Sequence, residues 1–293
     1  MPEGRITRVV PVTIEDRTFE ELKLPRPIAL SPLTIQELSP ANQVLCAAAA
    51  GYSHVGLRLV PAFPTEARWG MVGDTPMVRE VETNLRLTGM KVLDVEALRV
   101  KPDTRAVNWE PFFETAERLG ATEVRVVGND PDLSRFADNF AELCELAFPH
   151  GLALSIEPMP WNDLSTVKQT GEVLEHVNHV NAGLLVDPIH FFRAKNTFAD
   201  IDALPPGALR YCQMCDMTVP PKNMDEVIFQ ARNYRLSPGA GTADLKGLLA
   251  HLKDIPISVQ CINNRLVLSM SPLDRSRMYL EDTVALLNSI GEV

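Results

Sequence analysis

The chain has 293 residues, of which 45% are hydrophobic and 23% are charged, as in a globular protein with a sizeable core. A formal net charge of −10 without any Lys/Arg run disfavours nucleic-acid binding, and no apolar stretch is long enough to span a membrane. Five scattered cysteines and an N-terminus without an apolar segment favour a cytoplasmic protein without disulfides.

Strand-like and helix-like segments alternate through the first half of the chain. Residues 1–27 are charged and irregular, and we expect them to form a short N-terminal extension. The hydrophobic patterns then predict strands at 28–32, 54–60, 91–98 and 122–128, and helices at 40–50, 75–87, 109–119 and 133–148. Glycines that follow three of these helices are typical helix stops.

The same alternation continues to the end of the chain. It predicts strands at 152–157, 182–187, 208–213 and 257–261, and helices at 165–176, 191–204, 245–252 and 278–290. Eight strands separated by helices indicate an α/β fold, a single-domain (β/α)8 TIM barrel over residues 28–293. A doubly wound open sheet is the competing fold, but no GxGxxG motif follows the first strand.

Polar side chains stand at the ends of the last four predicted strands, at Glu157, Asp187, Gln213 and Gln260. The carboxyl ends of barrel strands converge on one face, where active sites are built. Oxygen ligands suit Mg²⁺ and Mn²⁺, and a nearby imidazole such as His190 suits Zn²⁺ or Co²⁺. A single carboxylate at a strand end would more often be a helix cap or a loop ion pair, so the prediction rests on the set.

Other polar residues leave more than one interpretation open. Arg58, Arg99 and Arg125 lie on the second, third and fourth predicted strands, where one of them can bind an acidic substrate or form an ion pair. Cys212 and Cys215 form a C-x-x-C motif, but no second pair accompanies it, and packing inside the barrel is the favoured reading.

From Ile28 to the C-terminus, the sequence resembles the xylose isomerase-like TIM barrels of the sugar phosphate isomerase/epimerase superfamily. The resemblance is carried by segments in the family order: IEP with Glu157, D-x-x-H with Asp187 and His190, Gln213 followed by Asp216, and YRLSPGAGTADL with Arg235, Pro238, Gly239, Gly241 and Asp244.

The resemblance implies a divalent metal (Mg, Mn, Co or Zn) held by Glu157, Asp187, Gln213 and Gln260. It also implies that His190 contacts the substrate or orients Asp187, and that Arg235 binds the substrate. Among the remaining polar groups, Asp216 near the site and Arg58 on the second strand are further substrate-binding candidates.

Two positions depart from the family pattern. The seventh strand usually offers His and here offers Gln213, as in relatives that resemble 3-dehydroshikimate dehydratases; the eighth usually offers Glu and here offers Gln260. Two amides leave the ligand set with less negative charge, so we expect weak metal binding and uncertain occupancy. An amide is also no base near neutral pH, which disfavours an epimerisation that needs two bases.

The sequence therefore predicts a metal-dependent isomerase or epimerase-like enzyme that acts on a sugar or polyhydroxylated keto-compound through an enediolate or enolate. Glu157 or His190 would remove the proton. The alternatives are a metal-dependent dehydratase or lyase of the 3-dehydroshikimate dehydratase type, and a non-catalytic barrel with a degenerate metal site. The expected partners are a small substrate and a second copy of the chain in a homodimer, with no nucleic acid or membrane.

Overall fold

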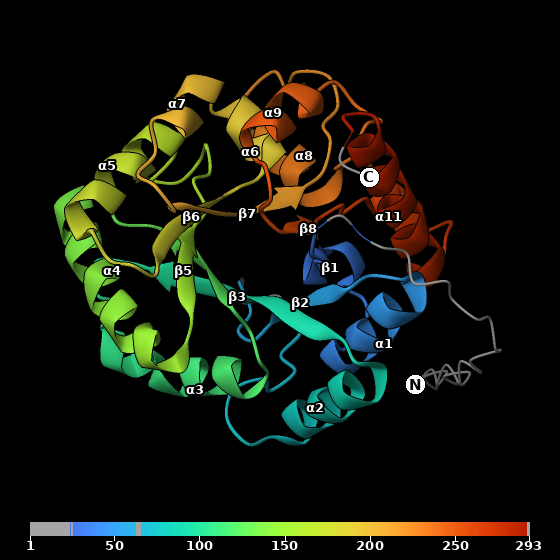
Figure 1. Cartoon of the computed structure of the whole chain (residues 1–293), viewed down its shortest axis with the longest axis horizontal. Coiled ribbons are helices and arrows are strands. Elements are labelled where there is room, and N and C mark those ends of the chain that lie inside the picture. The colour runs from blue at the N-terminus through green and yellow to red at the C-terminus, as the bar shows by residue number, and fades with distance from the viewer. Residues whose placement is uncertain (1–23, 25, 63–65, 292–293) are drawn as a thin grey trace, which may run out of the picture.

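Eight parallel strands hydrogen-bond side by side in chain order and close into a barrel (Figure 1). The computed structural model describes residues 24, 26–62 and 66–291. The strands are β1 Ile28–Leu30, β2 His54–Arg58, β3 Lys91–Val100, β4 Glu123–Gly128, β5 Ala153–Ile156, β6 Ala182–Val186, β7 Leu209–Met214 and β8 Ile257–Val259. Pairing of β1 with β8 completes the ring, which confirms the predicted (β/α)8 barrel.

The helices form an outer ring around the barrel (Figure 1). They are α1 Pro40–Ala50, α2 Pro76–Thr88, α3 Glu110–Arg118, α4 Leu133–Ala147, α5 Val167–Val177, α6 Pro188–Arg193, α7 Phe198–Asp202, α8 Met224–Asn233, α9 Leu245–His251, α10 Asn264–Val267 and α11 Pro272–Asn288, with short 3-10 turns η1 Pro32–Ile35, η2 Ala106–Trp109 and η3 Phe148–His150. Helix α11 packs beside α1, so the last helix closes the ring against the first.

Local sequence signals explain the start and end of α1. The Ser39 side chain accepts a hydrogen bond from the backbone N–H of Asn42, and Pro40 occupies the first turn, where its missing N–H costs nothing. Gly51 ends the helix at φ 94°, a left-handed conformation that glycine adopts without a steric penalty. The helix therefore begins and ends where the sequence predicts.

Apolar side chains between the helices and the barrel form the main core. Phe113, Phe136 and Phe140 are fully buried on α3 and α4. Burying one such ring stabilises the folded state by roughly 1.5–3 kcal/mol. In the described part of the chain, no helix is both long and apolar enough to cross a bilayer.

The structure corrects two element predictions. The single helix expected at 191–204 is two short helices, α6 and α7, because Lys195 between them adopts φ 59° and interrupts the helical backbone. Helix α8, capped by Asn223, was not predicted at all. The expected N-terminal extension falls mostly outside the described residues.

Candidate functional site at the carboxyl ends of the strands

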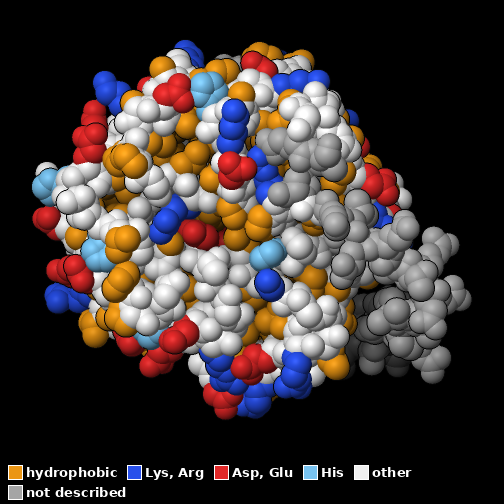
Figure 2. All heavy atoms as spheres, viewed as in Figure 1, with side chains coloured by type: hydrophobic (Ala, Val, Ile, Leu, Met, Phe, Trp, Pro, Cys, Tyr) orange, Lys and Arg blue, Asp and Glu red, His pale blue; other side chains and the backbone are white. Residues whose placement is uncertain are grey.

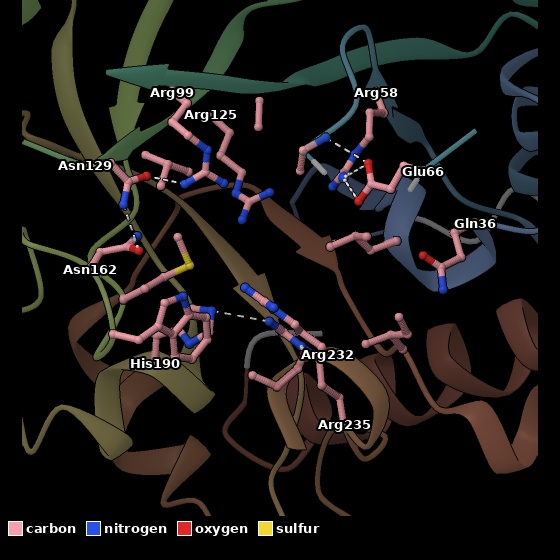
Figure 3. Close-up of a pocket in the computed structure, with 18 residues that line it drawn as sticks. Gln36, Arg58, Glu66, Arg99, Arg125, Asn129, Asn162, His190, Arg232 and Arg235 are labelled. Carbon is pink, nitrogen blue, oxygen red and sulfur yellow. Dashed lines mark hydrogen bonds and ion pairs between the residues drawn. The ribbon is translucent and has the colours of Figure 1, made fainter. Parts of the chain in front are cut away.

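A cavity of about 420 Å³ opens at the carboxyl ends of the barrel strands. His190 and Trp161 form part of its wall, together with five arginines: Arg58, Arg99, Arg125, Arg232 and Arg235. Figure 3 shows the guanidinium groups reaching into the cavity from different elements, Arg58, Arg99 and Arg125 from one side and Arg232 and Arg235 from the other. Acidic and basic side chains are interspersed on the face in Figure 2, so this arginine cluster contrasts with the mixed surface.

Arginines pair with the two buried carboxylates predicted to bind metal. Arg125 Nε donates to Glu157 Oε2 at 2.6 Å, and Arg235 Nη1 donates to Asp187 Oδ2 at 2.5 Å. Burial raises the pKa of Glu157 despite the opposing effect of Arg125. Burial acts in the same direction on Asp187, but Arg235 and His190 outweigh it and hold the pKa of Asp187 below its usual range.

A third buried carboxylate, Glu96 on β3, connects several strands. Its Oε2 accepts from Arg58 Nη2 at 2.6 Å and from Arg125 Nη1 at 3.2 Å, and its Oε1 accepts from Gln213 Nε2 at 3.1 Å. Burial alone would raise the pKa of Glu96, but the two guanidinium groups lower it. Glu96 is therefore a charged acceptor at the centre of the network, and the sequence analysis did not select it.

Gln213 and Gln260 belong to the same network, in a defined orientation. Gln260 Nε2 donates to Asp187 Oδ2 at 3.3 Å and to Gln213 Oε1 at 3.1 Å, while Gln260 Oε1 accepts from the Ser31 hydroxyl at 2.9 Å. A carboxylate can only accept, so Glu96 and Asp187 fix which end of each amide carries the nitrogen. Both amide oxygens, the atoms that would bind a cation, already accept a hydrogen bond from the protein.

His190 and Glu157 form the least satisfied part of the site. His190 Nε2 lies 3.6 Å from Glu157 Oε1 and 3.7 Å from Asp187 Oδ2. Within the described residues, neither Glu157 Oε1 nor His190 Nδ1 has a hydrogen-bond partner, although both are buried. Burial lowers the pKa of His190 to about 3, so the imidazole is neutral near pH 7. His190 lines the cavity, whereas the fully buried Glu157 does not.

Trp161 and Arg235 hold the His190 ring from two sides. The Trp161 ring meets the imidazole edge-on with centroids 4.8 Å apart, and Arg235 Nη2 lies 3.4 Å from Nε2. Because a guanidinium only donates, Nε2 accepts and the neutral ring carries its proton on Nδ1. His190 therefore has one buried N–H donor without a partner among the described residues.

Asp216 lies away from the cavity and organises a loop. Its carboxylate accepts backbone N–H groups of Met217, Gly241 and Ala243, at 2.7, 2.9 and 3.0 Å respectively. A Cβ on Gly241 would overlap this carboxylate, which explains the glycine. The predicted substrate-binding role of Asp216 would therefore be indirect. Asp244, the last motif residue named in the YRLSPGAGTADL segment, caps α9.

The remaining predicted substrate-binding arginine, Arg58, does line the cavity. It pairs with Glu66 at 2.8 Å as well as with Glu96. Arg235 is anchored on its other side, where Nε donates to the Ala231 carbonyl oxygen at 2.7 Å. Both guanidinium groups are held rigidly by protein acceptors, with Arg235 almost fully buried.

The ligand atoms partly fit a divalent cation. In the described part of the chain, Glu157, Asp187 and His190 offer one ligand atom each, all within 4.8 Å of one another. The partnerless oxygen of Glu157 and the neutral imidazole suit an ion, but Asp187 Oδ2 is engaged by Arg235 and Gln260. An ion at this triad would also meet two guanidinium groups, so binding requires Arg235 and Gln260 to release Asp187.

Cys212 and Cys215 are free and buried. Burial raises the pKa of both thiols, so they stay protonated near neutral pH. Cys215 Sγ lies 3.7 Å from Asp187 Oδ1, where it packs against the site. This environment agrees with the packing role expected for the pair.

The sequence analysis did not select the buried Glu96 or two residues that line the cavity, Arg232 and Asn162. Glu96 follows Asp94 at a spacing of two on β3, which places both on one face of the strand, and this spacing was an available signal. Arg232 lies on the unpredicted helix α8, and Asn162 lies in a loop without a motif. These two had no local signal.

The family model of the xylose isomerase-like TIM barrel matches residues 46–265. The chain belongs to this family. The match includes β2 to β8 and every predicted site residue, which confirms the resemblance inferred from the strand-end motifs.

A relative of known activity is similar to part of this chain. The inosose isomerase of Bacillus subtilis is 27% identical over 158 residues, covering 50% of this chain and 55% of the relative. The chain thus matches about half the length of this curated relative.

Two solved structures share the fold. The IolI protein with a bound zinc atom superposes with a TM-score of 0.76 at 19% identity, covering 91% of this chain and 100% of that one. The probable 3-DHS dehydratase AsbF of Bacillus anthracis has a TM-score of 0.68 at 13% identity, covering 88% and 98%.

Proposed function

We propose that the protein is an isomerase or epimerase-like enzyme that moves a proton on a polyhydroxylated carbonyl compound through an enediolate or enolate. The observation that carries the proposal is the buried Oε1 of Glu157, without a partner among the described residues, beside the neutral His190 of the arginine-lined cavity. Similarity to an inosose isomerase supports the reaction class.

Glu157 is the proposed base. Its pKa is raised by burial, which makes the carboxylate a stronger proton acceptor than an exposed glutamate. Arg125 holds Oε2, so Oε1 remains for the substrate proton. Because Glu157 is fully buried next to His190, the proposal requires the substrate to bind deep in the cavity against that ring.

His190 is the proposed hydrogen-bond donor. Its Nδ1–H would meet the carbonyl oxygen on which negative charge develops, and a neutral imidazole serves this role without adding a positive charge. Arg235 keeps the ring in this tautomer. Together the two residues supply a base for the carbon and a donor for the oxygen.

A divalent ion at Glu157, Asp187 and His190 would stabilise the same oxygen as a Lewis acid. Gln213 and Gln260 are further proposed ligands of such an ion, and each would first have to release the hydrogen bond that its amide oxygen accepts. Which metal binds remains part of the proposal, as do a homodimer and a cytoplasmic location.

A dehydratase or lyase of the 3-dehydroshikimate dehydratase type is the alternative, since it begins with the same proton removal and then expels water. Incubation with inosose or ketoses in D₂O, with and without Mn²⁺, Co²⁺ or Zn²⁺, tests the proposal by NMR. Deuterium at carbon next to the carbonyl supports isomerisation, and water loss from 3-dehydroshikimate supports the lyase. The absence of both across these substrates would instead favour a non-catalytic barrel.

A further inference from the structure

Arg99 differs from the cavity arginines that pair with carboxylates. Arg58, Arg125 and Arg235 each form an ion pair with a buried or half-buried acid. In the described part of the chain, Arg99 has no carboxylate partner, and its side chain donates to the amide oxygen of Asn129. Its guanidinium lines the cavity and reaches into it in Figure 3.

The surroundings of Arg99 add positive charge. Burial lowers its pKa first, and Arg125 and Arg232 lower it further, while Glu157 acts in the opposite direction. Arg232 lies over the Trp161 ring, 5.8 Å from its centroid, on the same cavity wall. This part of the cavity therefore has a positive potential that an anionic group would offset.

Hydrogen bonds connect Arg99 through Asn129 to a second donor, Asn162. A guanidinium only donates, so Asn129 turns its oxygen to Arg99 and its nitrogen to Asn162, with Nδ2 3.2 Å from Asn162 Oδ1. This leaves Asn162 Nδ2 as a buried donor without a partner among the described residues. Asn162 lines the cavity beside Arg99.

We propose that Arg99 and Asn162 bind an oxyanion of the substrate, a carboxylate or a phosphate, and so select acidic polyhydroxylated compounds over neutral ones. The inference rests on the proposed function, because it places the substrate in the same cavity. Charge-assisted bonds from such donors to an oxyanion are stronger than bonds to a neutral hydroxyl. A neutral polyol would leave the Arg99 charge without a counterion.

Three ligands with one carbon skeleton test this selectivity: D-sorbitol, D-gluconate and D-sorbitol 6-phosphate. Isothermal titration calorimetry at low and at physiological salt measures their dissociation constants. We expect one of the two anions to bind at least about tenfold more tightly than sorbitol, with salt weakening the anion more. Preference for gluconate assigns a carboxylate, and preference for the sugar phosphate assigns a phosphate. Equal binding of all three, or tighter binding of sorbitol, overturns the proposal.

Variants of Arg99 and Asn162 test whether these two residues cause the preference for anions. Arg99→Gln should remove most of the anion preference, and Arg99→Lys should keep part of it. Arg86→Gln, which removes an exposed arginine on α2, is the matched control and should bind as the parent protein does. If Arg99→Gln does not fold, Asn162→Ala decides, with an expected loss of about fivefold in anion affinity and no change for sorbitol. Unchanged anion preference in the folded variants overturns the assignment.

The outcome separates this inference from the proposed function. Proton exchange into neutral ketoses, with no preference for an anion, would overturn the acidic substrate and keep the isomerase. Anion binding that depends on Arg99, without any proton exchange or water loss, would keep the subsite and overturn the enzyme.

Discussion

Arg235 Nη1 lies 2.5 Å from Asp187 Oδ2, so a fixed guanidinium stands at a carboxylate that the family resemblance assigns to a metal ion. Gln260 Nε2 contacts the same oxygen. The three buried carboxylates of the site are thereby balanced by arginines before any ion arrives, and a dication must enter against that positive charge.

Removing the Arg235 charge should strengthen metal binding. We expect Arg235→Gln to lower the dissociation constant for Mn²⁺ or Zn²⁺ by at least tenfold, about 1.4 kcal/mol, because Asp187 becomes available to the ion. Calorimetry on the metal-stripped protein measures this. Arg135→Gln, which breaks an arginine–aspartate pair on α4, is the control and should leave the dissociation constant unchanged. Weaker metal binding in Arg235→Gln would show that the arginine supports the ion.

With a carboxylate at position 260, the free energy of unfolding should depend on bound metal. Without an ion, Gln260→Glu places a buried charge beside Asp187 and should cost roughly 3 kcal/mol of the free energy of unfolding. With Mn²⁺ or Zn²⁺ the loss should be recovered, and thermal denaturation with and without metal shows both effects. Gln36→Glu adds the same charge at an exposed position of the cavity and is the control for the added charge alone. Equal melting temperatures and equal metal affinity would contradict our account of position 260.

Glu157 should be required for proton transfer. Glu157→Gln keeps the side-chain shape but removes the base, so we expect deuterium exchange into a substrate to fall by about 10³-fold. Circular dichroism should show a folded protein. Glu82→Gln is the control, since it breaks an arginine pair on α2, outside the cavity. Exchange that persists in Glu157→Gln would point to His190 as the base.

Asp94, inside the barrel below the site, should make the protein less stable as pH rises. Among the described residues neither carboxylate oxygen has a hydrogen-bond partner, and burial, followed by Glu96, raises its pKa well above 3.8. The folded state therefore binds more protons than the unfolded state above pH ~4, and the free energy of unfolding falls as pH rises towards the folded pKa.

Asp94→Asn removes this titration. The variant should be more stable than the parent at pH 7, by about 1–3 kcal/mol, and should lose that part of the pH dependence. Urea denaturation between pH 4 and 8 measures both. Asp138→Asn, an exposed change on α4, should follow the parent curve. Lower stability of Asp94→Asn at pH 7 would mean that the charged form is favoured in the fold.

The strands and most helices were predictable because their signals are local. Ser39 and Gly51 mark the ends of α1 within the sequence itself. The break at Lys195 was not predictable, because the residues around it are held by contacts from elsewhere, such as Asn196 Oδ1 accepting from the Val167 N–H at 3.0 Å. Helix α8 was missed although Asn223, whose side chain accepts from the Glu226 N–H, is a local signal for a helix start.

The sequence predicted which residues form the site better than it predicted the hydrogen bonds and ion pairs between them. Strand-end position identified Glu157, Asp187, Gln213 and Gln260, since parallel strands present their carboxyl ends to one face. The pairing of arginines with these acids, and the hub at Glu96, depend on which side chains meet across the barrel. Sequence spacing carries no such information, because the paired residues come from different strands.

The hydrogen bonds from Ser31 through Gln260 and Gln213 to Glu96 all run in one direction, hydroxyl or amide to the next oxygen. Strands β3 and β7 face one another across the ring, so a charge on one wall orders the amides on the other. Losing the negative charge of Glu96 would free Gln213 to turn over, whereas Asp187 would still hold the nitrogen of Gln260. The atom that Gln213 offers to a cation is thus set by the charge of Glu96, on the opposite wall of the barrel.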